Sequence, residues 1–126
     1  MKKPEETHIL VVDDEEDLRT CLAEYLELEG YIVKLASNGK QAFEIVKQGD
    51  IDIILSDVRM AGGDGISLLE NVRKLFPVKP ALYFITGYAE ITSEDAVKKG
   101  AQMIFHKPVI IDEIINEFTS YLKAIS

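Results

Sequence analysis

The chain of 126 residues has few of the features that mark disulfide-rich, membrane-spanning or nucleic-acid-binding proteins. Its single cysteine, Cys21, excludes a disulfide bond within the chain. No apolar run approaches the roughly 20 residues of a membrane span, and no signal-peptide apolar region precedes Pro4. The 14 basic residues are outnumbered by 22 acidic ones, and this net charge of −8 argues against direct binding to nucleic acid or to an anionic membrane. We therefore expect a cytoplasmic protein.

Cys21 is predicted to be a core residue. It falls at helical spacing with Leu18, Leu22, Tyr25 and Leu26. Because a stripe of this kind usually faces the interior, we expect a small buried apolar side chain and not a reactive thiol.

Apolar runs and helical patterns alternate along the whole chain. The runs predict five strands, near residues 8–12, 31–36, 51–57, 81–87 and 101–107. Helical spacing predicts helices near residues 18–26, 42–46, 66–76, 89–99 and 111–122. Strands that alternate with helices indicate a flavodoxin-like, doubly wound α/β fold with five parallel strands in the order 2-1-3-4-5. Residues 1–126 suit one such domain, so we expect no second domain.

Most of the reactive side chains lie where the predicted strands end. The stretch "ILVVDDEED" places an acidic pair after the first strand, and the third, fourth and fifth strands end in an acid, a hydroxyl and an amine; the residues are Asp13, Asp14, Asp57, Thr86 and Lys107. Ligands of such sheets bind beyond the carboxyl ends of the strands, near the point where the strand order reverses. We therefore expect these five side chains to share one pocket.

The acids of this pocket need a cation. Three neighbouring carboxylates repel each other, and one lysine cannot balance them. Hard oxygen ligands, with no histidine or cysteine at a strand end, favour Mg²⁺, or Mn²⁺, over zinc. Mg²⁺ usually takes one or two carboxylates and completes its shell with water and phosphoryl oxygens. The pocket thus suits a phosphoryl group, and Asp57 is a competent nucleophile that would form an aspartyl phosphate.

Four motifs occur in order on the predicted elements: "VVDDEEDLR", "IILSDVRM" followed by "DG", "FITGY" and "FHKP". Together they resemble the receiver (CheY-like) domain of two-component response regulators, over nearly the whole chain from Ile9 to Tyr121. The resemblance implies a phosphoprotein that acts as a phosphorelay switch and takes its phosphoryl group from a sensor histidine kinase or a histidine phosphotransfer protein. Such a domain is not a conventional enzyme, although it catalyses its own phosphorylation and dephosphorylation.

The resemblance also implies the roles of the acidic residues. Asp57 would be the phosphoacceptor. Asp14 would bind Mg²⁺ directly, and Asp13 would bind it through water or as a second ligand. Asp57 and the backbone carbonyl of Arg59 would be the other ligands.

The switch residues are implied in the same way. Thr86 and Lys107 would bind phosphoryl oxygens, and the Lys107–Pro108 peptide bond would be cis. The surface of the fourth helix, fifth strand and fifth helix would contact an unknown downstream partner or a second copy, so the chain would be a monomer or a phosphorylation-dependent dimer.

Three positions depart from the family pattern. The aromatic residue that usually lies three positions before the lysine is replaced by Ile104, and Phe105, one step on, should face the other side of the strand. The loop at residues 61–63 reads Ala-Gly-Gly where a proline is usual. Arg59 and Tyr88 are bulky residues beside the predicted pocket and could slow loss of the phosphoryl group.

Other interpretations fit less well. A dehalogenase-like phosphohydrolase would carry a second aspartate two residues after the nucleophile, where this chain has Arg59. A nucleotide-binding enzyme would show GxxxxGK[ST] or GxGxxG, and neither motif is present. Acids that merely begin helices, or a module that binds partners without phosphorylation, would leave the matching Thr86 and Lys107 unexplained. Whether the domain acts alone or was excised from a larger regulator or hybrid kinase stays open.

Overall fold

The structure, a computed structural model, describes residues 2–60, 64–87 and 91–125. One parallel sheet has the order β2-β1-β3-β4-β5, built from β1 (His8–Val12), β2 (Ile32–Ala36), β3 (Ile53–Asp57), β4 (Ala81–Thr86) and β5 (Met103–His106). The helices are η1 (Pro4–Glu6), α1 (Glu16–Leu28), α2 (Gly39–Lys47), α3 (Gly65–Leu75), α4 (Ser93–Lys98) and α5 (Ile111–Ala124). The predicted fold class and strand order are confirmed. None of the helices in the described ranges is both long and apolar enough to cross a membrane.

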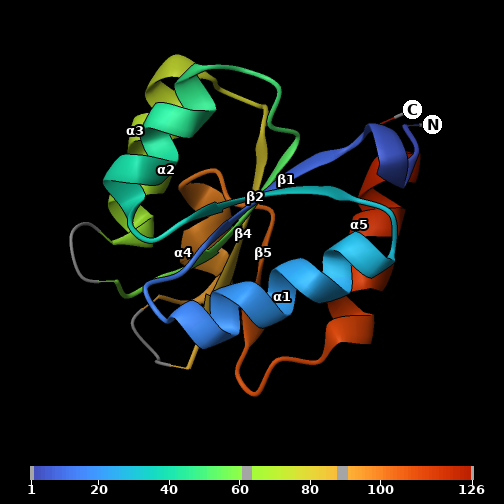
Figure 1. The fold of residues 1–126 in the computed structure, drawn as a ribbon. Helices are drawn as coiled ribbons and strands as arrows, with labels where there is room; N and C mark the ends of the chain where they lie inside the picture. The colour runs from blue at the N-terminus through green and yellow to red at the C-terminus, as the bar shows by residue number, and fades with distance from the viewer. Residues whose placement is uncertain (1, 61–63, 88–90, 126) are drawn as a thin grey trace.

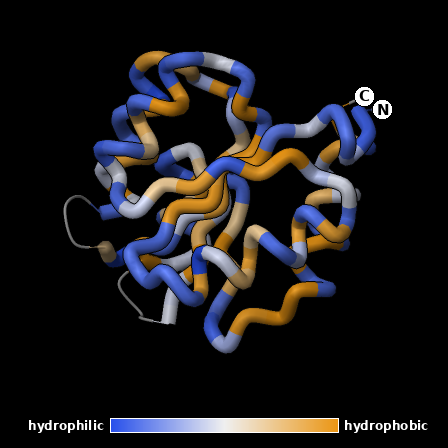
Figure 2. Tube along the Cα trace, in the orientation of Figure 1, coloured by the Kyte–Doolittle hydropathy of each residue, from blue (hydrophilic) through white to orange (hydrophobic). Residues whose placement is uncertain are grey.

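The sheet is covered on both faces. Helices α1 and α5 lie on one face and α2, α3 and α4 on the other, and the two ends of the chain lie close together (Figure 1). Hydrophobic residues follow the strands through the centre of the molecule (Figure 2). Since both faces of the sheet are buried, the strands need continuous apolar runs, as the sequence has.

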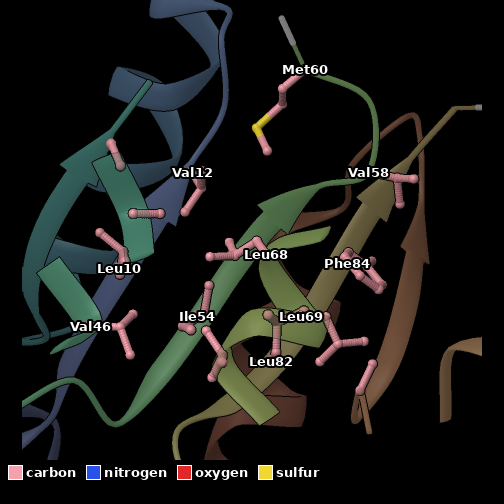
Figure 3. Close-up of a cluster of buried hydrophobic side chains, with 14 of the residues drawn as sticks. Leu10, Val12, Val46, Ile54, Val58, Met60, Leu68, Leu69, Leu82 and Phe84 are labelled. Atoms are coloured by element: carbon pink, nitrogen blue, oxygen red, sulfur yellow. The ribbon is translucent and has the colours of Figure 1, made fainter. Parts of the chain in front are cut away.

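Side chains of successive strand residues enter two separate cores. Leu10, Ile54 and Phe84 pack under α2, α3 and α4 (Figure 3). Their neighbours Val11 and Tyr83 pack under α1 and α5. This alternation decides which face each residue at a strand end approaches.

Three helix starts are fixed by side-chain caps. Asn38, Asp64 and Thr92 each accept a hydrogen bond from a backbone N–H three residues on, at the starts of α2, α3 and α4. The Thr92 cap places the first residue of α4 at Ser93, so the predicted start at residue 89 is wrong for the described residues 91 and 92.

One prediction of burial is also wrong. Cys21 is exposed, because α1 turns Leu22, Ala23 and Leu26 toward the sheet and leaves Cys21 on its flank. Val97 of α4 is 53% exposed, and Ala96 is the residue of that helix that packs inward.

Arg73, near the end of α3, joins three segments at the opposite end of the sheet from the strand-end acids. Its Nε donates to the carbonyl of Gly100 at 2.9 Å, Nη1 to that of Phe76 at 3.1 Å and Nη2 to that of Pro80 at 2.9 Å. A guanidinium suits this position because its donors point along fixed directions in one plane. The side chain thus holds the ends of α3 and α4 against the start of β4.

We expect Arg73→Ala to lower the free energy of unfolding by about 2–4 kcal/mol, because three carbonyls lose a charged donor. Arg73→Lys should recover only part of this loss, since an ammonium cannot reach three divergent carbonyls. The control Lys74→Ala changes an exposed neighbour and should have little effect. Urea unfolding checks this, and an Arg73→Ala loss no larger than that of Lys74→Ala would contradict the assignment.

Candidate functional site

The carboxyl ends of the strands bring the predicted residues to one edge of the sheet. Asp57 is the last residue of β3, which lies between β1 and β4. Asp13 directly follows β1, and Thr86 ends β4. All three side chains are buried: Asp13 is 1% exposed, Asp57 5% and Thr86 0%. Burial of so many polar groups at one edge is costly unless each has a partner.

Asp57 is paired with the lysine that follows β5. The Nζ of Lys107 lies 2.9 Å from Oδ2 of Asp57. The second oxygen of Asp57, Oδ1, accepts the backbone N–H of Arg59 at 3.3 Å. Burial works to lower the pKa of Lys107, but the hydrogen bond and charge of Asp57 outweigh it, so the pKa is raised and the ammonium is firmly charged.

Asp13 is the second buried acid and has no ammonium in direct contact among the described residues. Its Oδ1 accepts the backbone N–H of Glu15 at 2.8 Å. Burial raises the pKa of Asp13 from 3.8 to about 6; the Glu15 hydrogen bond opposes this rise, and the charges of Asp57 and Asp14 add to it. The pocket therefore holds more negative charge than Lys107 balances.

The backbone around Asp57 is closely packed. The hydroxyl of Ser56 donates to the Asp57 carbonyl at 2.8 Å, and the N–H of Gly65 donates to the Val58 carbonyl at 2.8 Å. A Cβ at Gly65 would overlap the carbonyl oxygen of Asp57. This contact explains why the "DG" pair has glycine at its second position, and it fixes the start of α3 against the end of β3.

The donor set fits a hard divalent cation. The negative charges of Asp13 and Asp57 repel each other, and Asp14 lies exposed beside them. All three side chains offer oxygen donors. Within residues 2–60, 64–87 and 91–125, no group of three or more His, Cys, Asp or Glu side chains is arranged as a ready cage. Mg²⁺ does not require such a cage, because it usually takes one or two protein carboxylates and keeps several waters.

The positions that depart from the family pattern have clear places. Ile104 is buried on the α3 and α4 side with Phe84. Phe105 lies on the opposite face, stacked on Tyr83 with ring centroids 5.7 Å apart, as alternation predicts. The Lys107–Pro108 bond is cis, as predicted. Arg59 is exposed, whereas Tyr88 and the loop at 61–63 lie outside the described residues.

Sequence reasoning missed two residues that support the site. Ser56 precedes Asp57 in β3, and its hydroxyl donates to the Asp57 backbone carbonyl. Arg19 was not considered, yet its Nη1 donates to the Asp13 carbonyl at 2.7 Å. Both contacts end on backbone oxygens, which residue identities alone do not indicate.

We expect the free energy of unfolding of the metal-free protein to contain a contribution from Asp13 that falls as pH rises from 3.8 to about 6. In this range folded Asp13 keeps its proton while the unfolded residue has released it, so the unfolded state binds fewer protons and stability decreases with pH. Asp13→Asn removes the contribution, so its stability relative to the parent should rise across the range, by on the order of 1 kcal/mol or more.

Urea unfolding in a chelator at pH 4 to 7 measures this difference. Glu24→Gln, which removes a charge from the exposed side of α1, is the control. A difference between Asp13→Asn and the parent that stays constant with pH would contradict the assignment.

Two curated proteins show how the chain relates to others. It is 41% identical over 107 residues to the transcriptional regulatory protein ZraR of Escherichia coli (strain K12), a match of 84% of this chain and 24% of ZraR. It is 36% identical over 115 residues to sporulation initiation phosphotransferase F of Bacillus subtilis (strain 168), a match of 90% of this chain and 92% of that protein. The chain thus spans about a quarter of ZraR and nearly all of the second relative.

The fold and the family agree. A chain of the crystal structure of the CheX–CheY–BeF3–Mg²⁺ complex from Borrelia burgdorferi superposes with a TM-score of 0.83 and 26% identity, covering 92% of this chain and 89% of that one. The family model described as response regulator receiver domain matches residues 9–119. This match covers most of the sequence and includes all the strand ends described above and the whole of helices α1 to α4. The chain belongs to the response regulator receiver domain family.

Proposed function

We propose that this chain is a phosphorylation-dependent switch of a two-component system, in which Asp57 accepts a phosphoryl group from a sensor histidine kinase or a histidine phosphotransfer protein. The observation that carries the proposal is the placement of Asp57. It is a buried carboxylate at the end of the central strand, with Lys107 at 2.9 Å and a second buried acid, Asp13, beside it. A structural ion pair would need no second acid, and that acid is costly in the folded protein.

The chemistry follows from the groups present. An oxygen of Asp57 attacks phosphorus, the bond from phosphorus to the donor breaks, and the donor leaves with the electron pair. Asp13, Asp14, Asp57 and the carbonyl of Arg59 would hold Mg²⁺, with Mn²⁺ a substitute of similar chemistry. The bound ion would supply the positive charge that the phosphoryl oxygens and the acids need. The relative from Borrelia burgdorferi, whose structure is named for a complex with BeF3 and Mg²⁺, supports this choice of ion.

The switch consists of the groups that face the new charge. A phosphoryl group adds roughly −1.5 to −2 charges and three acceptor oxygens. Lys107 would exchange its carboxylate partner for a phosphoryl oxygen, and the Thr86 hydroxyl would donate to another. The backbones of these two residues are joined, because the N–H of Lys107 donates to the carbonyl of Thr86 at 2.9 Å. Helix α4, six residues long and capped by Thr92, is the element expected to shift with Thr86.

The surface of α4, β5 and α5 would carry the signal to a partner. A groove of about 500 Å³ lies there between β5 and α5, and its lining includes Phe105, Ile110 and Glu117. The hydroxyl of Tyr83, buried in β4, donates to the Glu117 carboxylate at 3.0 Å. This bond connects the strand that ends in Thr86 to the wall of the groove, so a change at the site has a direct route to the surface.

Loss of the phosphoryl group is expected to be slow. Arg59 and Tyr88 would hinder the attacking water, and Ile104 in place of an aromatic side chain would weaken the usual coupling between strand β5 and Thr86. The process that the switch controls depends on the whole protein. ZraR is about four times as long as the matched region, whereas the Bacillus subtilis relative is a domain of similar length. Both a stand-alone switch and a domain of a longer regulator are therefore compatible with the proposal.

We expect incubation with acetyl phosphate and Mg²⁺ to add the mass of one phosphoryl group, because the donor carries its own activated phosphoryl group and needs no kinase. The intact mass of the protein measures this. Omission of Mg²⁺, with chelator present, should abolish the adduct, and so should Asp57→Asn, which keeps the size of the side chain. Asp64→Asn is the matched control, since it changes an acid that caps α3, and it should leave the adduct in place.

An adduct of equal yield in Asp57→Asn would contradict the proposed acceptor. Absence of any adduct in the parent protein would favour a module that binds partners without phosphorylation.

A further inference from the structure

Arg19 of α1 contacts the loop that carries the acidic pair. Its Nη1 donates to the carbonyl of Asp13 at 2.7 Å, six residues back along the chain. Its own backbone N–H donates to the carbonyl of Glu15 at 3.0 Å, so the residue belongs to the first turn of the helix. The side chain therefore extends back from the first turn of α1 to Asp13, the residue that directly follows β1.

Three hydrogen bonds hold Asp13 in place. Its N–H donates to the carbonyl of Ala36, at the end of the neighbouring strand β2, at 3.2 Å. Its Oδ1 accepts from the N–H of Glu15 at 2.8 Å, and its carbonyl accepts from Arg19. The Arg19 contact is the one of these three that depends on a side chain other than that of Asp13, so it can be removed without changing Asp13 itself.

The choice of partner is informative. A guanidinium next to several carboxylates would normally pair with one of them. In the described part of the chain the hydrogen bond of the Arg19 side chain goes to a backbone carbonyl instead. Arg19 lines a recess of about 180 Å³ together with Leu35 and Ala36 of β2, Ser37, and Gln41 of α2.

We propose that Arg19 is a positioning residue for the cation site: it holds the Asp13 peptide in place so that the acidic pair is preorganised for Mg²⁺. The inference rests on the proposed function, which places Mg²⁺ at Asp13 and Asp14. It goes beyond that function because Arg19 is not among the residues proposed to hold the metal or the phosphoryl group. Removal of a group that orients a metal ligand typically weakens metal binding by roughly 10- to 100-fold.

Charge and positioning predict opposite effects, which makes the inference testable. Arg19 is a cation near a cation site, so removal of its charge should tighten Mg²⁺ binding if electrostatics alone mattered. If Arg19 positions Asp13, its removal should weaken binding even though the pocket becomes more negative.

The experiment is a titration of the ¹⁵N-labelled full chain with Mg²⁺ alone, without phosphodonor, for the parent, Arg19→Gln and Arg19→Lys. We expect Arg19→Gln to raise the Kd for Mg²⁺ by about tenfold. Arg19→Lys keeps the charge and one donor, so it should recover part of the affinity. Lys40→Gln, which removes an exposed cation from α2, is the matched control and should leave the Kd unchanged or slightly lower.

Two further readouts separate positioning from a general loss of stability. Amide exchange of the Glu15 N–H, measured without metal, should be faster in Arg19→Gln, because its acceptor Asp13 is less fixed. Amide exchange in the core strands should match the parent, and the Arg19→Lys result stands if Arg19→Gln does not fold. An Arg19→Gln protein that binds Mg²⁺ as tightly as the parent, or more tightly, would overturn this inference and leave the proposed metal site standing. A parent protein that binds no Mg²⁺ would overturn the proposed metal site as well.

Discussion

The ion pair between Asp57 and Lys107 is the contact on which the rest of the site depends. It joins residues 50 positions apart, at the ends of β3 and β5, across the end of β4 where Thr86 lies. The pair can form because strand order brings these ends to one edge, and it satisfies both oxygens of Asp57 together with the Arg59 N–H. A phosphoryl group on Asp57 would become the new partner of this lysine, and so would disturb the contact that joins the ends of β3 and β5.

The Asp57–Lys107 pair also leaves a surplus of negative charge in the pocket. One ammonium is committed to Asp57, and Asp13 stays buried with a pKa raised by burial to about 6. The protein holds this unfavourable acid in place with backbone hydrogen bonds and with Arg19. Groups held rigidly in an unfavourable state are characteristic of functional sites. The surplus negative charge and the oxygen donors both fit a hard divalent cation.

The sequence predicted the features that depend on the pattern of apolar residues. It missed those that depend on hydrogen-bond partners brought together by the fold. Continuous apolar runs such as Ile9 to Val12 led to the strands, their order and the strand-end residues, because burial on both faces leaves a direct mark on composition. Helical spacing did not separate the core face of α1 from its flank, so Cys21 was wrongly assigned to the core. The roles of Arg19 and Arg73 were not predictable, because their acceptors are backbone carbonyls that only the fold brings near.

The central claim is that Asp57, of the acids at this edge, carries the phosphoryl group. Borohydride reduction of the protein after reaction with acetyl phosphate and Mg²⁺ converts an aspartyl phosphate to homoserine, and peptide mass spectrometry then identifies the position. The account predicts homoserine at residue 57 and unmodified aspartate at residues 13 and 14. Homoserine at residue 13 or 14, or unmodified aspartate at all three positions in a protein that gained phosphoryl mass, would contradict it.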